Sequence, residues 1–198
     1  MPDKQVSIGM GLRMAILKIA RMGHPILLRR ADTVADPEAP DIARLIADMI
    51  ETMRDAPGVG LAAPQVHVSL RVVVFWVPRA RADDPDAPEG SAHGPVPLTV
   101  LINPHLEKID EECQVGWERC LSVPGLTGLV PRSRQVRYTG TTLNGEVISR
   151  VASGFHARVV QHECDHLDGI LYPMRMTDLS RLGFVDDIVK GEPVELES

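Results

Sequence analysis

Clustered cysteines and long apolar runs are both missing from this sequence, and each absence excludes a class of protein. The 198 residues contain three cysteines, Cys113, Cys120 and Cys164, an odd number without the spacing of a disulfide framework. At least one thiol is therefore free, as expected in a reducing compartment. No stretch reaches the roughly 20 apolar residues that a membrane-spanning helix needs, and the first residues lack the pattern of a signal peptide. We expect a cytoplasmic protein with no membrane partner.

Clustered basic residues are missing as well. Lysine and arginine total 21 against 27 aspartate and glutamate, which gives a formal net charge of -6. Direct nucleic-acid binding is not expected, because it requires grouped positive charge to neutralise phosphates. The rest of the composition, 44% hydrophobic and 24% charged, is that of an ordinary globular protein. A chain of this length suits one hydrophobic core, so we expect a single domain over residues 1–198 with a leader at 1–14.

The apolar pattern predicts helices near both ends of the chain. Apolar residues recur at helical spacing over residues 42–53, with a start at residues 36–37 or 40–41 and an end at Gly58. A second helix is predicted at residues 154–167. The C-terminal segment 177–198 is predicted to hold a weaker helix at residues 178–190, followed by an acidic tail.

Strand signals fill the region between the helices. The predicted strands are residues 15–19, 71–77, 98–102, 135–138 and 147–151, and the last two flank an Asn-Gly hairpin turn at Asn144-Gly145. Residues 78–97 hold four acidic side chains, five prolines and two glycines, so they predict an excursion on the surface. This order of elements favours an α+β fold of mostly antiparallel sheets over alternating βαβ units.

The predicted helix 154–167 carries a metal motif. His162 and His166 are four residues apart, so both imidazoles lie on one helix face about one turn apart. Glu163 lies roughly 100° further round, close enough to bond water at the metal without being a ligand. The alternative is a solvated helix face with no metal. If the metal interpretation holds, we expect the sheets to pack around this helix as the centre of the fold.

A catalytic metal site usually has three protein ligands and one open position, so two histidines need a third ligand. Cys120 is the best candidate, because it follows a probable strand from whose end a thiolate could point toward the helix. Burial as a small apolar side chain is the commoner fate of a free cysteine. We assign Cys113 and Cys164 to structural positions, since Cys164 points roughly away from the two histidines.

Three segments in order resemble the motifs of the peptide deformylases. They are residues 58–65 (GVGLAAPQ), 118–122 (ERCLS) and 161–166 (QHECDH), and the resemblance extends over residues 16–172. The family normally has glycine where this chain has Arg119. Arginine there would be strained if the position needs a positive φ, and otherwise it would crowd or charge the mouth of the cleft.

The resemblance implies a metal-dependent hydrolase acting on linear amides, which removes the N-formyl group from the formylmethionine of nascent polypeptides and releases formate. Cys120, His162 and His166 would hold one divalent ion, Fe²⁺ in the cell, with Ni²⁺, Co²⁺ or Zn²⁺ as replacements. Water activated at the metal would attack the formyl carbon, with Glu163 as general base and acid. The implied partners are formyl-Met peptides and nascent chains near the ribosome exit.

Further roles follow from the same resemblance. Gln65 and the backbone N–H of Leu121 would stabilise the oxyanion that forms during attack. The residues that would contact the substrate are Gly58, Val59, Gly60, Phe155 and Val159. From sequence alone, a plain tight turn at residues 58–63 and core packing of Val159 and Leu121 are equally reasonable. For Asp165, Arg132 and Arg158, a place beside the site competes with an ordinary solvated one.

Two rival functions stay open. A His-Glu-x-x-His motif alone is better known from zinc proteases, although the segments around Gln65 and Cys120 argue against that class. The other rival is a catalytically silent relative that keeps its metal for stability and acts as a binding module, for which Arg119 is the only support.

Overall fold

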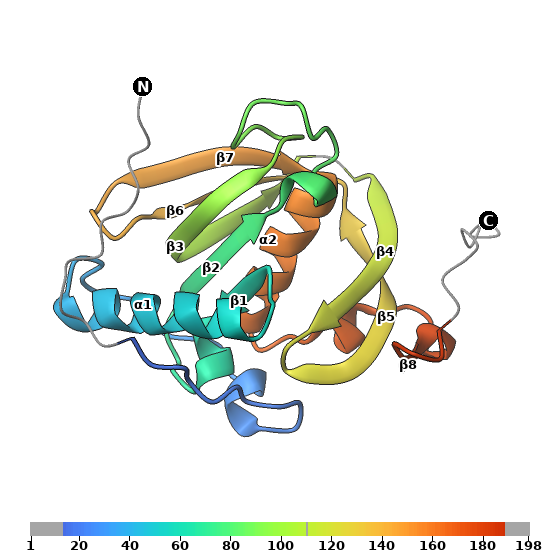
Figure 1. Ribbon diagram of the computed structural model, residues 1–198, viewed down its shortest axis with the longest axis horizontal. Coiled ribbons are helices and arrows are strands. Elements are labelled where there is room, and N and C mark those ends of the chain that lie inside the picture. Colours follow the sequence, from blue (N-terminus) through green and yellow to red (C-terminus); the bar gives the residue numbers. More distant parts are fainter. Residues whose placement is uncertain (1–13, 110, 189–198) are drawn as a thin grey trace.

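The computed structural model describes residues 14–109 and 111–188, which form an α+β fold with two antiparallel sheets (Figure 1). The first sheet has the strand order β1-β2-β3-β6-β7, and the second has the order β4-β5-β8. The first sheet consists of β1 (Gly60–Ala62), β2 (Val72–Val77), β3 (Val96–Lys108), β6 (Gln135–Thr141) and β7 (Val147–Ser153). The second consists of β4 (Cys113–Cys120), β5 (Val123–Ser133) and β8 (Leu182–Phe184). Every pairing among these strands is antiparallel, as the sequence predicted.

The two longer helices lie where the sequence placed them. Helix α1 spans Pro40–Asp55, so it uses the second of its two predicted starts. Proline at the first helical position loses nothing, because the N–H that it lacks would have no partner within the helix. Helix α2 spans Gly154–Leu167, the predicted range. The short 3₁₀ helices are η1 (Pro25–Leu28), η2 (Ala63–Val66), η3 (Arg79–Arg81), η4 (Tyr172–Arg175) and η5 (Leu179–Arg181).

Strand β2 is apolar throughout because helices cover both of its faces. Val72 and Val74 belong to a buried cluster with the apolar face of α1. Val73 and Phe75 belong to the cluster that includes the buried face of α2. Successive side chains of a strand point to opposite faces, so one continuous run serves two cores.

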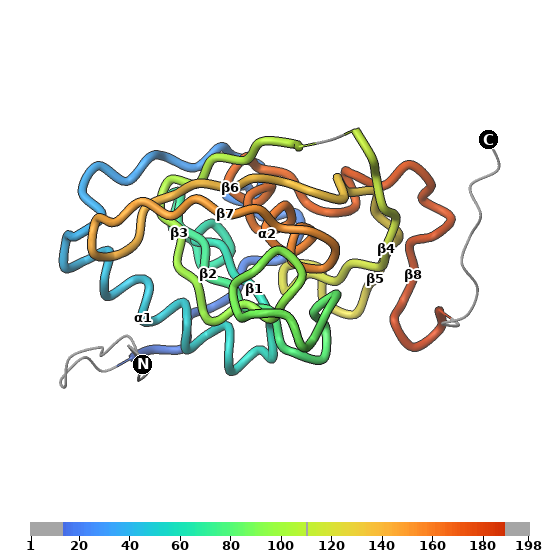
Figure 2. The backbone as a smooth tube through the Cα atoms, turned by 90° about the horizontal axis from the view of Figure 1, so that it is seen from above, coloured from blue at the N-terminus to red at the C-terminus, as the bar shows by residue number. Residues whose placement is uncertain are grey.

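Helix α2 is largely buried in the described chain. Eleven of its 14 residues are buried, and it contacts strands of the first sheet as well as β5 of the second. Figures 1 and 2 both show it between the first sheet and the β4–β5 hairpin. Residues on α2 are therefore held in place from several sides. None of the helices in the described residues is long and apolar enough to cross a membrane.

Two predicted elements are wrong. Residues 15–19 form no strand, because the backbone N–H groups of Ala15 and Leu17 donate to Asp48 Oδ1 and Thr52 Oγ1 of α1, at 2.7 and 2.8 Å. The predicted helix at 178–190 is replaced, as far as residue 188, by η5 and β8. Pairing of β8 with β5 supplies tertiary hydrogen bonds that override a weak helical pattern. Residues 189–198 and 1–13, which include the tail and most of the leader, lie outside the described residues.

The acidic excursion connects β2 and β3 (Figure 1). Most of its side chains are exposed, and it contains η3. Within this connection, Asp83 contacts the rest of the fold. Its carboxylate accepts hydrogen bonds from the Ser153 hydroxyl at 3.0 Å and from the Phe155 backbone N–H at 3.3 Å. Asp83 therefore ties the excursion to the N-terminal end of α2, where the helix dipole favours a negative charge.

Candidate metal centre

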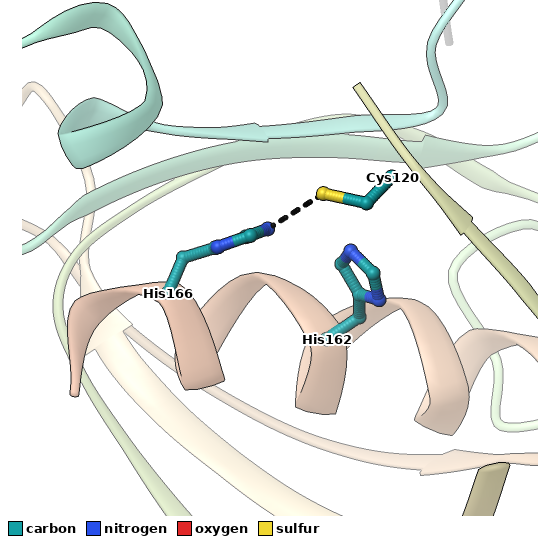
Figure 3. Close-up of side chains that lie close together, drawn as sticks. All are labelled: Cys120, His162 and His166. Carbon is teal, nitrogen blue, oxygen red and sulfur yellow. Dashed lines mark hydrogen bonds between the residues drawn. The ribbon is translucent and has the colours of Figure 1, made fainter. Parts of the chain in front are cut away.

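The three side chains proposed as ligands converge at one point. Cys120 is the last residue of β4, and His162 and His166 project from α2 (Figure 3). One ligand atom from each lies within 4.8 Å of the other two, and Cys120 Sγ is 3.2 Å from His166 Nε2. All three residues are buried. A strand end from one sheet thus meets one face of the C-terminal half of α2, and two sequence segments more than 40 residues apart form a single cluster.

The chemistry of this cluster fits a divalent transition metal. A thiolate and two imidazoles are ligands that such ions accept, and three protein ligands leave a position for water or substrate. Glu163 follows His162 on α2, and its Oε2 atom is buried without a hydrogen-bond partner among the described residues. A buried polar atom normally has a partner. An unpaired carboxylate oxygen beside three metal donors is expected where a polar species completes the site.

The charges at the cluster favour an ionised sulfur. Burial alone would raise the pKa of the Cys120 thiol, but the charge of His166 and hydrogen bonds from His162 and His166 hold it well below its ordinary value. At Glu163 the effect of burial prevails instead, and it raises the pKa of that carboxyl to about 7 despite the nearby histidines. The cluster therefore combines a thiolate that can bind a metal with a carboxyl group that can exchange a proton near neutral pH.

Glu118 fixes the orientation of His162. His162 Nδ1 lies 2.7 Å from Glu118 Oε2, so its other ring nitrogen is left for the metal. Arg132 donates to both carboxylate oxygens of Glu118, at 2.8 and 2.9 Å, and Arg158 donates to one of them at 2.9 Å. Burial would raise the pKa of Glu118, but the bonds from Arg132 and His162 bring it far below the usual range. Glu118 therefore stays ionised and holds His162 in its orientation through the bond to Nδ1.

Asp165 is linked to Glu118 indirectly, through Arg132. It lies in ion pairs with Arg132 and Arg175 and touches none of the three donors directly. Its connection to His162 runs through Arg132 and Glu118. Of the two places left open for Arg132 and Arg158, the one beside the site is correct and the solvated one is wrong, since both arginines are buried and pair with Glu118.

Gln65 reaches the cluster from η2. Its Nε2 is 3.5 Å from Cys120 Sγ and 3.1 Å from Ser122 Oγ. Its Oε1 accepts a hydrogen bond from the Ala62 backbone N–H at 2.9 Å, which fixes the orientation of the amide. The NH₂ end of the side chain therefore points at the donors, while the residue itself is only 2% exposed.

The donors open into a cleft of about 890 Å³. All five residues predicted to contact substrate line it, namely Gly58, Val59, Gly60, Phe155 and Val159. Gln65, Leu121, His162 and Glu163 line it too. The structure also decides between the alternatives at Arg119. Its φ is not positive, and the exposed residue lines the cleft mouth, so this arginine adds charge there rather than backbone strain.

The other cysteines lie apart from the donors. Cys113 is exposed and Cys164 is buried in the core cluster against the first sheet, both as free thiols. Sequence reasoning missed the role of Glu118, although a signal for it existed. Glu118 and Cys120 are two residues apart on one strand, so their side chains share a face. A carboxylate on the face that presents a metal ligand is a natural partner for a neighbouring histidine.

Gly60 leaves the room that Glu163 occupies. A Cβ atom at residue 60 would lie 2.2 Å from Glu163 Oε1 and 2.6 Å from its carboxyl carbon. We expect Gly60→Ala to push the carboxylate out of place and to lower kcat about a hundredfold, since misplacement by about 1 Å can cost that much. Metal content should not change, because no donor atom is displaced. Steady-state kinetics with metal analysis tests this.

Gly58→Ala serves as a milder variant with which Gly60→Ala can be compared. There the nearest atom to a new Cβ is the Leu121 Cδ1 methyl at 3.1 Å, which can rotate away. The loss in kcat should be clearly smaller than for Gly60→Ala. Equal losses in the two variants would show that the backbone of this loop, rather than the position of Glu163, determines the rate.

Comparisons with known proteins agree with one another. The family model described as polypeptide deformylase matches residues 16–182. The chain is 53% identical to peptide deformylase 2 of Ralstonia nicotianae over 86% of this chain and 93% of that protein. It is 52% identical to peptide deformylase 1 of Bordetella pertussis, over 85% of this chain and 92% of that protein.

Among solved structures, a Met-Ala-Ser-bound class I type b peptide deformylase from Acinetobacter baumannii has a TM-score of 0.72 and 39% identity, covering 82% of this chain and 99% of that one. The peptide deformylase from Ehrlichia chaffeensis has a TM-score of 0.74 and 32% identity, covering 84% and 91%.

Proposed function

The chain belongs to the polypeptide deformylase family, and from this premise we propose how its own residues carry out the family's reaction. The protein is a metal-dependent hydrolase that removes the N-formyl group from nascent peptides. The reaction cleaves the formyl C–N bond and yields formate and a free amine. One observation carries the assignment of roles, namely the convergence of Cys120, His162 and His166 within 4.8 Å, beside the carboxylate of Glu163.

The metal would be held by Cys120, His162 and His166, and we propose Fe²⁺ as the ion in the cell. Nickel, cobalt or zinc are its replacements in a preparation, because all of these ions accept a mixed thiolate and imidazole set. When bound, such an ion polarises a carbonyl and makes water a stronger nucleophile near neutral pH. Glu118 keeps His162 in the orientation that this binding needs, through the bond to Nδ1.

Glu163 is the proposed general base and acid. It takes a proton from the attacking water and later delivers it to the departing amine, for which a pKa of about 7 is well placed. The side-chain amide of Gln65 donates to the oxyanion that develops on the formyl oxygen, and the backbone N–H of Leu121 is its proposed second donor. Gln65 suits this role because Ala62 already fixes its amide with the NH₂ end toward the donors.

We propose that the cleft holds the first residue of the substrate. Val59, Leu121, Phe155 and Val159 line it as apolar walls for a methionine side chain, while Gly58 and Gly60 let the peptide backbone approach closely. The structure in which the Acinetobacter baumannii enzyme is bound to Met-Ala-Ser supports a peptide in this position. We propose formyl-Met peptides as substrates here, and nascent chains near the ribosome exit as their source in the cytoplasm. We further propose that the chain is one catalytic domain, since α2 packs against strands of both sheets.

The proposal is tested by a formate-release assay with protein loaded anaerobically with Fe²⁺ or with Ni²⁺. Formyl-Met-Ala-Ser should yield one formate per peptide, and peptide bonds within an unformylated peptide should stay intact. Cleavage of internal bonds without formate release would favour the zinc-protease alternative. Full metal loading without any turnover would favour the silent binding module.

A further inference from the structure

The mouth of the cleft carries two arginines that have no role in the chemistry above. Arg119 extends from β4 immediately before the ligand Cys120, and Arg81 comes from η3 in the acidic excursion. Both are exposed and both line the same cleft as His162 and Glu163. They therefore lie on the path that a peptide follows between solvent and the donors.

Each arginine is held at the rim by a specific feature. The Arg81 guanidinium lies 4.1 Å from the centre of the Phe155 ring, in a cation–π contact on a residue that itself lines the cleft. Asp83, two residues further on, anchors this segment to Ser153 and to the Phe155 backbone. Arg119 stands where the β4–β5 ladder shifts register between Glu118 and Cys120, so it has no partner in the ladder. Such irregularities redirect side chains beside active sites.

The two positive charges lie close enough to repel each other, and within the described residues neither has an ion-pair partner. Burial lowers the pKa of Arg81, and the nearby positive charge of Arg119 lowers it further. Among residues 14–109 and 111–188, the carboxylates that line the cleft are Glu118, already paired with Arg132 and Arg158, and Glu163 at the donors. The acidic side chains of the excursion do not line it.

We propose that Arg81 and Arg119 form a basic gate that selects formyl-Met peptides carrying a carboxylate in the residues just after the formylmethionine. This inference rests on the proposed function, because the formyl group must sit at the donors for the following residues to reach the rim. An extended peptide advances about 3.3 Å per residue. With its first side chain inside the apolar walls, the next residues lie within reach of two long arginine side chains.

The net charge of the protein and the two arginines predict opposite substrate preferences, so their effects can be told apart. A net charge of -6 repels acidic peptides at long range, so the global field predicts a preference for basic substrates. A preference for acidic ones must come from a local positive rim. Exposed charge pairs contribute modestly, so the expected selectivity is about threefold to tenfold in kcat/KM. It should reside mainly in KM, because the contacts are equal in the ground and transition states.

The experiment compares formyl-Met-Glu-Ser-amide with formyl-Met-Lys-Ser-amide on the nickel-loaded enzyme. The ratio of their kcat/KM values should exceed one at low salt and approach one at high salt, because exposed charges are screened. The ratio should fall in Arg119→Gln and in Arg81→Gln. Arg137→Gln is the matched control, since it removes the same charge from β6 outside the cleft. Formyl-Met-Ala-Ser with a free or an amidated C-terminus separates the effect of a terminal carboxylate from that of an acidic side chain.

Binding of the deformylated peptides Met-Glu-Ser-amide and Met-Lys-Ser-amide gives a second readout that needs no turnover. Tighter binding of the acidic peptide, lost in Arg119→Gln, supports the gate. A ratio that is unchanged in both cleft variants, or reduced as much by Arg137→Gln, overturns it. Absence of formate release together with an intact binding preference would instead contradict the proposed function, while the preference of the two arginines for acidic peptides would be retained.

Discussion

Replacement of Glu163 by glutamine is expected to lower kcat for a formyl-Met peptide about a thousandfold, within the range that a general acid–base group contributes. Glutamine has almost the same shape but no basic oxygen, so it can neither accept the proton of water nor return it to the amine. Glu163 is not one of the three donors, so metal content should equal that of the wild type. The measurement is steady-state kinetics on variant and wild type after metal analysis of both.

The same variant should be at least as stable as the wild type. Burial raises the pKa of Glu163 to about 7, which shows that the charged form is disfavoured where it stands. A neutral amide avoids that cost, so the free energy of unfolding should stay constant or increase. Natural active sites often give up stability in this way. Denaturant unfolding of both proteins therefore separates loss of chemistry from loss of fold.

Asp168→Asn is the matched control for Glu163→Gln. Asp168 lies at the C-terminal end of α2, its side chain is 46% exposed, and it pairs with Arg71 outside the cleft. Removing this charge changes the helix but not the site, so kcat should stay within about twofold, as expected for a surface ion pair. If Glu163→Gln kept more than about a tenth of the wild-type kcat, its proposed role would have to be abandoned.

The elements that sequence predicted well are those whose local pattern and tertiary surroundings agree. Helix α2 matched its predicted bounds because its apolar residues and its ending turn signals both describe a buried helix. Strand β2 matched because a continuous β-branched run fits a strand covered on both faces. In both cases the burial that the pattern anticipates is supplied by the fold.

The elements that failed are those whose partners come from elsewhere in the chain. The segment at residues 15–19 has strand-like composition, but it bonds to side chains of α1 rather than to another strand. Strand β8 contains Gly183 and only three residues, so nothing local marks it as a strand. It exists because β5 offers an edge for pairing. Local patterns cannot contain that information.

The candidate site also combines features that local sequence predicts with features that depend on distant parts of the chain. That the three candidate ligands lie together could be predicted because helical spacing places His162 and His166 on one face, and because the segment around Cys120 matched a family motif. The support of His162 by Glu118, and of Glu118 by Arg132 and Arg158, joins three separate elements. Only the folded arrangement brings them together. Arg81 is a further example, since its place at the cleft depends on how the excursion docks against α2.

Replacement of Cys120 by serine is expected to weaken metal binding at least about a hundredfold, because even an outer-shell partner of a ligand is worth about 10–100-fold. Serine has a similar size, so the packing around residue 120 against Val123 and Leu27 should change little. Its hydroxyl remains protonated near neutral pH and is a poor ligand for soft ions. Metal retained after gel filtration, and competition with a chelator, measure the loss. In Co²⁺-loaded protein the thiolate charge-transfer absorption should disappear as well.

Cys113→Ser and Cys164→Ser are the matched controls, and the structure gives different reasons for each. Cys113 is exposed at the first residue of β4, far along the strand from the donors. Cys164 is buried, and burial raises the pKa of its thiol, whereas the histidines lower that of Cys120. Both controls should retain metal as the wild type does, although Cys164→Ser is expected to unfold more easily because it buries a hydroxyl in an apolar cluster. Equal metal retention in Cys120→Ser and Cys113→Ser would refute the ligand assignment. Since the three side chains are chemically identical, a difference between them must come from where the fold places each sulfur relative to His162 and His166, and from the charges and burial around it.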